Sequence, residues 1–576
     1  MKQLSFQLSW GDVAVPVLTQ LAESDQAMDG VLPGMTAGEF ILVSLRRLAQ
    51  PCWEIHLRAQ RAWAGDALAQ TRVAFSGRRP THLLAPAYRG VFERWAADQA
   101  PEFEYRGPGG SAARLSDAQR LALPLLIVQM GGARDDDYWL IGADPEMAAA
   151  FQITFGAEEW QVILNWRYLA AAGVHADEKR RIIVKPCRTL TEALNAWFEW
   201  ATPDVPPGPA WLHDIALNDY DYFSKNGRGW FADIDAACQM IAPAHRHRAI
   251  FCLHGWYDQI GRYCFDPHQR RFDESWTVFP HIHHPDLLKL ENRDVVMAGG
   301  PIGYAFRNLK QHHPITLDWA GIRERLSYAR QRGLRVAFYH ATGMQIASDS
   351  SAHRSAGARL DHIQTPLWQG PDLIGATCLV NPLHPEVRDW MLAYTQALLE
   401  RVGDLIDALV LDEAYYIPGG ALGPASCPGY ADRAQMRLVR EIAALCHACR
   451  PDIAYLTADH LGTPAMEPRA VPYSLFADGI YHDSWSSPFS WGCAFFPTWR
   501  NVTWSCNWAP VSNYANIRWS VLAHDAPIAV SNGCFGDDVG LADMDAPTLQ
   551  RFVDLWQIKI SRRQQRGLTV VDMTRP

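Results

Sequence analysis

The feature that most constrains the fold of this chain is an alternation of short apolar strands with helical segments, which runs through residues 206–576. Eight strand-like segments are present, and each ends in polar residues. Eight strands of this kind, most of them followed by a helix, predict a (β/α)₈ TIM barrel. The predicted strands cover residues 211–217, 249–258, 334–343, 408–416, 453–462, 477–485, 502–508 and 526–534.

Five of the helices are clear from the spacing of their apolar residues. In the segment 384–403, Val387, Met391 and Tyr394 belong to a series with three- and four-residue intervals, and Gly403 follows as a helix stop. The crossovers after the fifth and sixth strands are the weakest part of the pattern. The predicted helices cover residues 318–333, 384–403, 431–450, 513–525 and 546–564.

The first 200 residues follow a different pattern. Their segments are short, strand-like and separated by turns rich in Gly, Pro and Asp, which is typical of an antiparallel sandwich. A helix over 189–201 closes this region, and the stretch 202–210 then holds four Pro within nine residues. We therefore expect a multidomain chain: an N-terminal antiparallel β-sandwich of the supersandwich type over 1–205, then a catalytic barrel with a short C-terminal tail over 206–576.

Carboxylates at strand ends are the first candidates for catalysis, because the active site of such barrels lies at the C-terminal ends of the strands. The apolar fourth strand delivers Asp412, and the sixth strand delivers Asp483 in the same context, with an aromatic residue close behind. Two opposed carboxyls are what glycoside hydrolysis needs, one as nucleophile and one as acid/base. We assign Asp412 as the nucleophile and Asp483 as the acid/base.

Other acids compete for these roles. Asp478 begins the sixth strand in the place that Asp407 holds before the fourth, so it should point to the opposite end of the barrel. Glu413 is adjacent to Asp412, and neighbouring residues of a strand face opposite ways. The position repeated in both strands favours Asp412 and Asp483.

Polar and aromatic residues at the remaining strand ends are expected to bind substrate, although each could instead satisfy a loop backbone. This predicted shell consists of Asp214, His254, Trp256, Tyr257, His340, Tyr415, Asp459, His460, Trp485, Trp504, Asn507, Trp508, Asn532 and Asp538. The histidines of the loop segment 280–286 lack a carboxylate at a recognised spacing. We therefore expect neither a metal nor another cofactor.

Composition narrows the class of partner. The formal charge is −9, and no basic stripe follows the chain, which argues against nucleic acid. The 23 Trp suit stacking on sugar faces, although core packing is the commoner use of any one of them. A carbohydrate substrate fits these properties.

Location and redox state follow from two further observations. No apolar run resembles a secretion signal or reaches the length of a membrane span, so we expect a cytoplasmic protein without a membrane partner. The 12 Cys are irregularly placed, which indicates reduced thiols. Cys446 and Cys449 have CxxC spacing but fall in the last turn of a predicted helix, with no second pair to complete a zinc site.

The segments LVLDEAYY (409–416) and GIYHDSW (479–485) resemble the nucleophile and acid strands of the retaining α-glycosidases of glycoside hydrolase clan D, family 36, and of family 31. GLRVAFYHATG (333–343) resembles their third strand, and APIAVSNGC (526–534) the last strand of the family 36 type. The resemblance implies a β-supersandwich before the barrel. It also implies a nucleophile at Asp412, an acid/base at Asp483 and hydrolysis of an α-linked glycoside with retention.

Other functions remain open on the sequence. A transglycosylase would use the same carboxylates with a sugar as acceptor. A metal-dependent hydrolase of amidohydrolase type would need His-x-His on the first strand, where only His213-Asp214 is present. A non-catalytic carbohydrate-binding protein is the third alternative, and the sugar, the linkage, exo or endo action and assembly into a homo-oligomer stay undetermined.

Overall fold

The structure is a computed structural model of the 576-residue chain. It describes residues 4–10, 13–21, 27–33, 40–47, 53–59, 67–76, 78–86, 92–105, 119–131, 138–146, 149–156, 159–168, 179–206, 208–221, 229–253, 256, 265–266, 269–272, 319–347, 362–365, 377–380, 382, 385–412, 414, 430–461, 473–484, 503–506, 514–524, 527–532 and 540–565.

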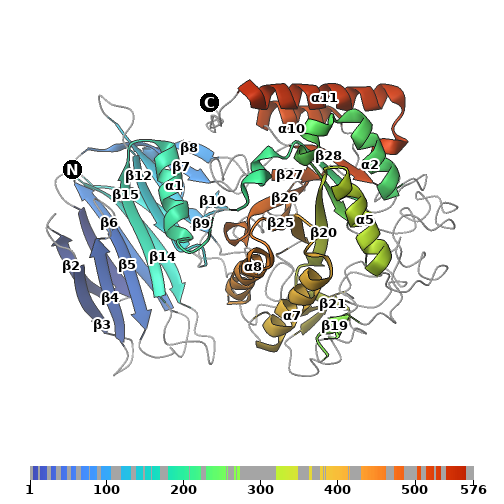
Figure 1. The fold of residues 1–576 in the computed structure, drawn as a ribbon. Helices are drawn as coiled ribbons and strands as arrows, with labels where there is room; N and C mark the ends of the chain where they lie inside the picture. Colours follow the sequence, from blue (N-terminus) through green and yellow to red (C-terminus); the bar gives the residue numbers. More distant parts are fainter. Residues whose placement is uncertain are drawn as a thin grey trace. The chain divides into compact units, whose positions relative to one another are not determined.

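The chain divides into two compact units (Figure 1). The first is formed essentially by Met1–Asp204, and the second by Val205–Ala425 with Ala434–Val571. The first unit contains antiparallel sheets and the second a parallel sheet with helices, so the expected fold class of β-sandwich followed by TIM barrel is confirmed.

The first unit contains two sheets. One has the order β10-β9-β13-β14-β6-β1-β2, with antiparallel pairs except for β10 and β9, and the other has the order β3-β4-β5-β15-β12-β11-β7-β8. Their strands are β1 Leu4–Trp10, β2 Val13–Leu21, β3 Ala27–Pro33, β4 Phe40–Arg47, β5 Trp53–Ala59, β6 Ala67–Ser76, β7 Pro80–Pro86, β8 Phe92–Ala96, β9 Phe103–Tyr105, β10 Gln119–Arg120, β11 Leu125–Met130, β12 Tyr138–Ala143, β13 Ala149–Phe155, β14 Glu159–Tyr168 and β15 Lys179–Cys187.

Apolar residues from both sheets form one core. Phe75 of β6 stacks on Trp160 of β14 at 3.9 Å between ring centroids, and Trp139 of β12, in the other sheet, meets Phe75 edge-on at 5.1 Å. All three rings are buried. Helix α1 (Leu190–Ala201) closes the unit, and Thr189 caps it by accepting the Glu192 N–H at 3.0 Å.

The second unit contains eight strands in one parallel sheet of order β27-β26-β25-β24-β20-β17-β16-β28. The two ends of this order, β27 and β28, also lie against each other, so the sheet closes into a barrel. In chain order the strands are β16 Leu217–Asp221, β17 Ala249–Leu253, β20 Arg335–Thr342, β24 Ala408–Asp412, β25 Ala454–Leu461, β26 Gly479–Ser484, β27 Thr503–Cys506 and β28 Ile528–Asn532.

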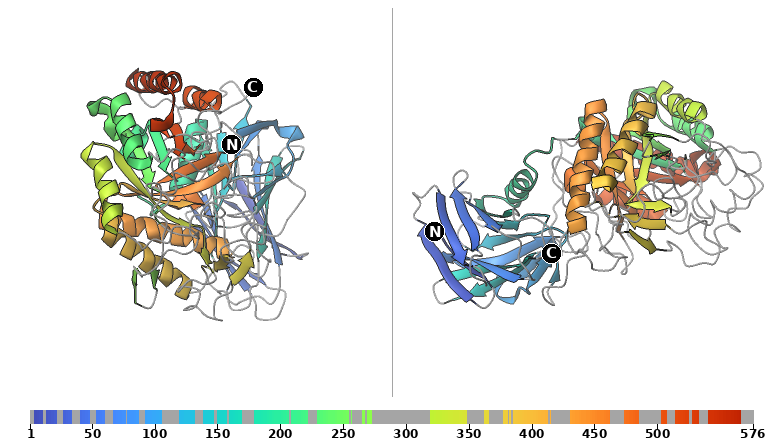
Figure 2. Two further views of the ribbon diagram at one scale, coloured as in Figure 1. Left: turned by 90° about the vertical axis from the view of Figure 1, so that its right-hand side faces the viewer. Right: turned by 90° about the horizontal axis from the view of Figure 1, so that it is seen from below.

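Helices lie outside these strands (Figures 1 and 2). They are α2 Gly229–Met240, α5 Trp319–Gln331, α7 Pro385–Val402, α8 Tyr430–Cys449, α10 Tyr514–His524 and α11 Ala546–Gln565, with short 3₁₀ turns η3 Ala210–Asp214, η4 Pro243–Arg248, η7 Tyr473–Phe476 and η8 Leu541–Asp543. The unit also contains two small antiparallel sheets: β18 Phe265–Asp266 with β19 Arg271–Phe272, and β21 Gln345–Ala347 with β22 His362–Thr365 and β23 Thr377–Val380.

Helix α7 shows why the periodicity was informative. Its apolar series from Val387 to Val402 is buried along the whole helix. Gly403 ends it by donating its N–H to the Leu399 carbonyl at 2.7 Å. A Cβ at position 403 would lie 2.5 Å from that carbonyl oxygen, so the tight stop requires glycine.

The first strand is the main correction to the predicted elements. Residues 211–217 were expected to form it, but 210–214 form η3, and the strand begins only at Leu217. Helix α2 was not singled out from the sequence. In the part of the chain that the structure describes, no helix is long and apolar enough to cross a bilayer.

Candidate active site

Parallel strands end at the same edge of a barrel, and we call this the carboxyl edge and the opposite one the amino edge. Strand β24 has a carboxylate at each end: Asp407 immediately before it and Asp412 as its last residue. Residues 408–412 are all buried. The two acids are therefore separated by one fully buried strand.

Asp412 lies at the carboxyl edge, as predicted, with a side chain that is 9% exposed. The Tyr339 hydroxyl of β20 donates to Asp412 Oδ2 at 3.3 Å. The N–H of Gly343, which follows β20, donates to the Asp412 carbonyl at 2.7 Å. Both the carboxylate and the backbone of Asp412 are thus held by the neighbouring strand.

Strand β20 has a β-bulge directly after Tyr339. Tyr339 pairs with Val410, but Ala341 already pairs with Leu411, so His340 is the extra residue. The carbonyls on either side of this irregularity have side-chain partners: Trp256 Nε1 donates to Tyr339 O at 2.8 Å, and the Tyr394 hydroxyl donates to His340 O at 2.6 Å. Bulges of this kind redirect a side chain next to an active site.

His340 is completely buried behind the strands, so its predicted contact with substrate is wrong. Its Nε2 lies 2.9 Å from Thr395 Oγ1 of α7, and its Nδ1 lies 3.1 Å from the Tyr455 hydroxyl of β25. Burial lowers the pKa of His340 to about 3, so the ring is neutral at physiological pH. The sequence identified the position but not the side of the sheet that the His340 side chain faces.

Trp256 is also placed differently from the prediction. It is 2% exposed, and it packs on Phe338, Trp319 and Phe272 with ring-centroid distances of 5.1, 5.9 and 6.3 Å. A sugar platform needs an open ring face. Trp256 is therefore a core residue that holds the Tyr339 carbonyl.

Asp483 lies on β26, one residue before its end, where it pairs with His460 of β25 and Cys506 of β27. The backbones of Asp459 and His460 lie near the carboxyl end of β25, Trp504 lies in β27, and Asn532 is the last residue of β28. The structure describes the backbone at these five positions and not the side chains. The other predicted site residues lie outside the described residues: His254, Tyr257, Tyr415, Trp485, Asn507, Trp508, Asp538, the competing Glu413 and the histidines of 280–286.

Asp214 was predicted at the end of the first strand, and this placement is wrong. It is an exposed residue of η3, which precedes β16 and therefore belongs to the amino edge. The apolar residues near it, Leu212 and Ile215, are buried, but they belong to η3 and its C-cap and not to a strand.

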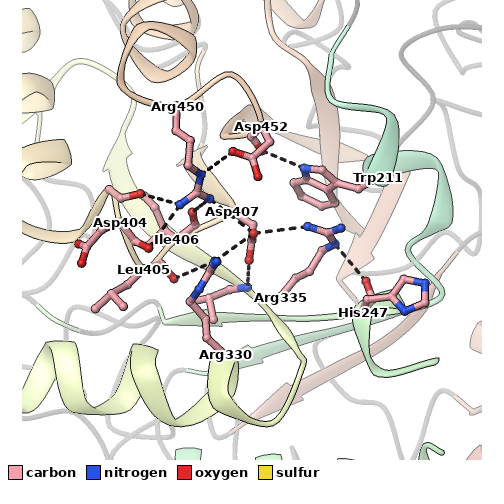
Figure 3. A network of polar contacts seen from close by, with 12 residues as sticks. Trp211, His247, Arg330, Arg335, Asp404, Leu405, Ile406, Asp407, Arg450 and Asp452 are labelled. Atoms are coloured by element: carbon pink, nitrogen blue, oxygen red, sulfur yellow. Dashed lines mark hydrogen bonds and ion pairs between the residues drawn. The ribbon is translucent and has the colours of Figure 1, made fainter. Parts of the chain in front are cut away.

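The amino edge carries a dense ionic network around Asp407 (Figure 3). Asp407 Oδ1 lies 3.1, 3.4 and 3.6 Å from guanidinium nitrogens of Arg330, Arg335 and Arg450, while its Oδ2 accepts the Val336 N–H at 2.9 Å. Three cations and a backbone amide around one buried carboxylate form a structural network that fixes β24 against β20.

Asp478 repeats this arrangement before β26. Its Oδ2 accepts the Tyr455 N–H of β25 at 2.7 Å and lies 2.9 Å from His447 Nε2. Its own N–H donates to the Tyr455 carbonyl at 2.8 Å, as the N–H of Asp407 does to the Val336 carbonyl at 2.6 Å. The prediction that Asp407 and Asp478 share a place at the end opposite the catalytic candidates is confirmed.

Sequence reasoning missed two residues near Asp412. No sequence feature distinguishes Tyr339 from other strand residues, and the bulge beside it has no sequence signature either. Gln435 of α8, 1% exposed, donates its Nε2 to the carbonyl of Ala414 at 3.2 Å and so holds the chain just past Asp412. A polar residue on the buried side of α8 was the available signal.

The described residues offer no metal-binding site. Among the residues that the structure describes, no group of three or more His, Cys, Asp or Glu is arranged to hold a metal ion. Cys446 and Cys449 are free thiols at the end of α8, the first buried and the second exposed. Burial raises the pKa of the Cys446 thiol well above its usual range, so it stays protonated.

Comparison with known proteins relates the fold to glycosidases. No protein-family model matches the chain, and neither does any curated protein. Among solved structures, the GH36 α-galactosidase AgaA of Geobacillus stearothermophilus matches with a TM-score of 0.54 at 11% identity, over 98% of this chain and 76% of that one. A variant of AgaA in complex with raffinose matches with a TM-score of 0.53 at 10% identity, over 98% and 76%.

The α-galactosidase of Lactobacillus brevis matches with a TM-score of 0.51 at 11% identity, over 97% of this chain and 70% of that one. The similarity covers both units, and it confirms the resemblance to family 36 at the level of the fold.

Proposed function

We propose that this protein is a retaining glycoside hydrolase that cleaves α-linked glycosides, with Asp412 as nucleophile and Asp483 as acid/base. The observation that supports this most directly is the buried Asp412 carboxylate at the carboxyl edge of strand β24. The Tyr339 hydroxyl donates to its Oδ2 at 3.3 Å. The barrel that carries it shares its fold with α-galactosidases.

The register of the barrel supports pairing Asp412 with Asp483. Leu411 pairs with Thr457, and Thr457 pairs with Ile480, so position 481 is level with 412. Asp483 lies two positions further toward the carboxyl edge. Residues an even number of positions apart lie on the same face of a pleated strand, as a catalytic pair requires.

The proposed reaction has two displacements. In the first, an Asp412 oxygen forms a bond to the anomeric carbon while the glycosidic bond breaks, and Asp483 gives its proton to the departing oxygen. In the second, Asp483 takes a proton from water, the water oxygen bonds to the anomeric carbon, and the ester bond to Asp412 breaks. Two inversions restore the original configuration and leave both acids as they began.

Tyr339 suits the first displacement because it is a neutral donor. Its hydroxyl fixes the orientation of the carboxylate without placing a positive charge beside it. A nucleophile held in one orientation avoids the entropy loss that a mobile carboxylate would incur during attack.

The direct test is a substrate panel with three matched variants. Wild type, Asp412→Asn and Asp483→Asn are assayed on aryl α- and β-glycosides and oligosaccharides, beginning with α-galactosides, because the structural neighbours are α-galactosidases. Asp478→Asn is the control, since Asp478 lies on the same strand as Asp483 but at the amino edge. The proposal requires loss of activity in the first two variants and retention in the third.

Azide distinguishes the two roles. Added to Asp412→Asn, it should take the place of the missing nucleophile and yield a glycosyl azide of inverted configuration. Retention also requires a carboxyl separation of about 5 to 5.5 Å, against about 6.5 to 9.5 Å for inversion. Failure of wild type to cleave any glycoside, or full activity in both Asn variants, would refute the assignment.

A transglycosylase remains the second candidate, because sugar and water compete for the same glycosyl intermediate. Product analysis with an added sugar acceptor separates the two activities. Predominant transfer at low acceptor concentration would replace hydrolysis as the function, without changing the assigned acids.

A further inference from the structure

Four buried side chains on the elements around strand β24 form a hydrogen-bonded network. His340, Thr395, Tyr394 and Tyr455 all lie at 0% exposure and come from β20, α7 and β25. Strands β20 and β25 are the two neighbours of β24 in the barrel. The network therefore spans the strand that carries Asp412.

The donors and acceptors of this network can be assigned. The Thr395 hydroxyl donates its one proton to the Met391 carbonyl at 2.8 Å, so toward His340 it must accept, and His340 Nε2 must carry the hydrogen. In the neutral ring Nδ1 is then an acceptor, and it receives the Tyr455 hydroxyl at 3.1 Å. Both ring nitrogens are satisfied in a single tautomer, so the ring has one orientation.

His340 is also the extra residue of the bulge, and Tyr339 precedes it directly. The Tyr339 hydroxyl donates to Asp412 Oδ2 at 3.3 Å, so the residue that contacts the carboxylate is the direct chain neighbour of the bulged residue. We propose that His340 is a positioning residue, which fixes the bulge through Thr395 and Tyr455 and thereby holds Tyr339 against Asp412. This inference rests on the proposed function for its catalytic consequence, but the contact itself is independent of activity.

The test uses the full-length protein with 3-fluorotyrosine at position 339, observed by ¹⁹F NMR. Asp412→Asn should shift the resonance and so establish the contact. Thr395→Val removes the acceptor of His340 with little change of shape, and His340→Phe removes both ring partners. Both should move the resonance and lower kcat by about tenfold with KM unchanged, because a displaced nucleophile affects the chemical step.

The matched control is Thr202→Val in the first unit. Thr202 is 3% exposed, and its hydroxyl donates to the Phe198 carbonyl at 2.7 Å, four residues earlier, as Thr395 does to Met391. It should lower Tm without moving the resonance or kcat. A wild-type resonance in Thr395→Val, or an equal shift in Thr202→Val, would overturn the proposal.

Two complications are separated by design. Should His340→Phe fail to fold, Thr395→Val decides alone. Should wild type cleave no glycoside, the proposed function fails, but the fluorine resonance still reports whether His340 holds Tyr339. No response of the resonance to Asp412→Asn would refute the contact on which the inference stands.

Discussion

Strand β24 has a buried aspartate at each end, and the two carboxylates have different kinds of partner. Asp407, at the amino edge, is surrounded by the guanidinium groups of Arg330, Arg335 and Arg450 and also accepts a backbone N–H. Asp412, at the carboxyl edge, accepts a hydrogen bond from the neutral phenol of Tyr339. The amino edge neutralises its carboxylate, whereas the carboxyl edge orients one.

The difference separates stability from chemistry. A carboxylate enclosed by cations gains stability but loses its ability to attack a carbon, since its lone pairs are engaged and its charge is compensated. A carboxylate oriented by a neutral donor retains its charge. Residue type is the same and burial is similar at the two ends, and the three guanidinium partners mark Asp407 as a structural acid.

The largest effect is expected for Asp412→Asn. Removing a nucleophile abolishes the first displacement, so kcat on the best glycoside should fall by roughly a thousandfold or more. Tm should stay within a few degrees of wild type, because Asn can still accept from Tyr339. Turnover measured on purified protein, with circular dichroism as the check of folding, decides this, and a fall below tenfold would contradict the comparison.

Asp407→Asn should show the opposite profile. It leaves three arginines without their common carboxylate, and we expect the free energy of unfolding to fall by about 3 kcal/mol. Activity per folded molecule should be unchanged. Urea unfolding and kcat at saturating substrate give the two numbers, and a catalytic loss without destabilisation would reverse the roles assigned to the two edges.

Asp233 of α2 tests what happens when a buried carboxyl has another acid nearby. Its pKa is raised to about 8: burial is the largest cause and the nearby Asp543 carboxylate adds to it, while the Ala542 N–H, which donates at 2.7 Å, acts in the opposite direction. Between pH 4 and 8 the unfolded chain releases this proton while the folded chain keeps it, so stability falls as pH rises.

Asp233→Asn should remove this fall. The variant should gain at least about 1 kcal/mol over wild type between pH 5 and pH 8, as measured by urea unfolding at both values. Asn retains an acceptor for the Ala542 N–H. Parallel pH profiles for the two proteins would show that Asp233 ionises normally in the folded state.

The smallest effect belongs to Asp404→Asn. Asp404 pairs with Arg323 at 2.6 Å, but the two side chains are 59% and 41% exposed. The hydrogen bond from Arg323 lowers the pKa of Asp404, so its contribution is present at neutral pH and is lost as pH falls through that lowered pKa. We expect Asp404→Asn to lower the free energy of unfolding by less than about 1 kcal/mol at pH 7, and by less still in high salt. A loss as large as that of Asp407→Asn would show that burial is irrelevant at this edge.

Much of the barrel was predictable because the spacing of apolar residues along a helix depends on local geometry. The series from Val387 to Val402 and the stop at Gly403 depend on helix geometry alone, and the structure agrees. The first strand was misplaced because Trp211, Leu212 and Ile215 are as apolar as strand residues, although they bury their side chains from η3. A short buried turn and a short buried strand have the same composition.

The site was predictable in position but not in detail. Asp412 follows from the rule that chemistry gathers at strand ends, and Asp407 and Asp478 were separated from it by the same rule. The bulge at His340 places Thr342 instead of Ala341 opposite Asp412, and it arises from pairing with β24, about 70 residues later. Such a non-local feature leaves no trace in one segment of sequence.

The paired bonds of Asp407 to Val336 and of Asp478 to Tyr455 bear on how this barrel can change over evolutionary time. Each fixes the start of one strand against its neighbour, so a slip by one residue would break two bonds at once. Insertions and deletions at the opposite rim can then accumulate without disturbing the scaffold. A barrel anchored in this way is a natural recipient for loop exchange, and new substrate ranges should be reachable by grafting at one rim only.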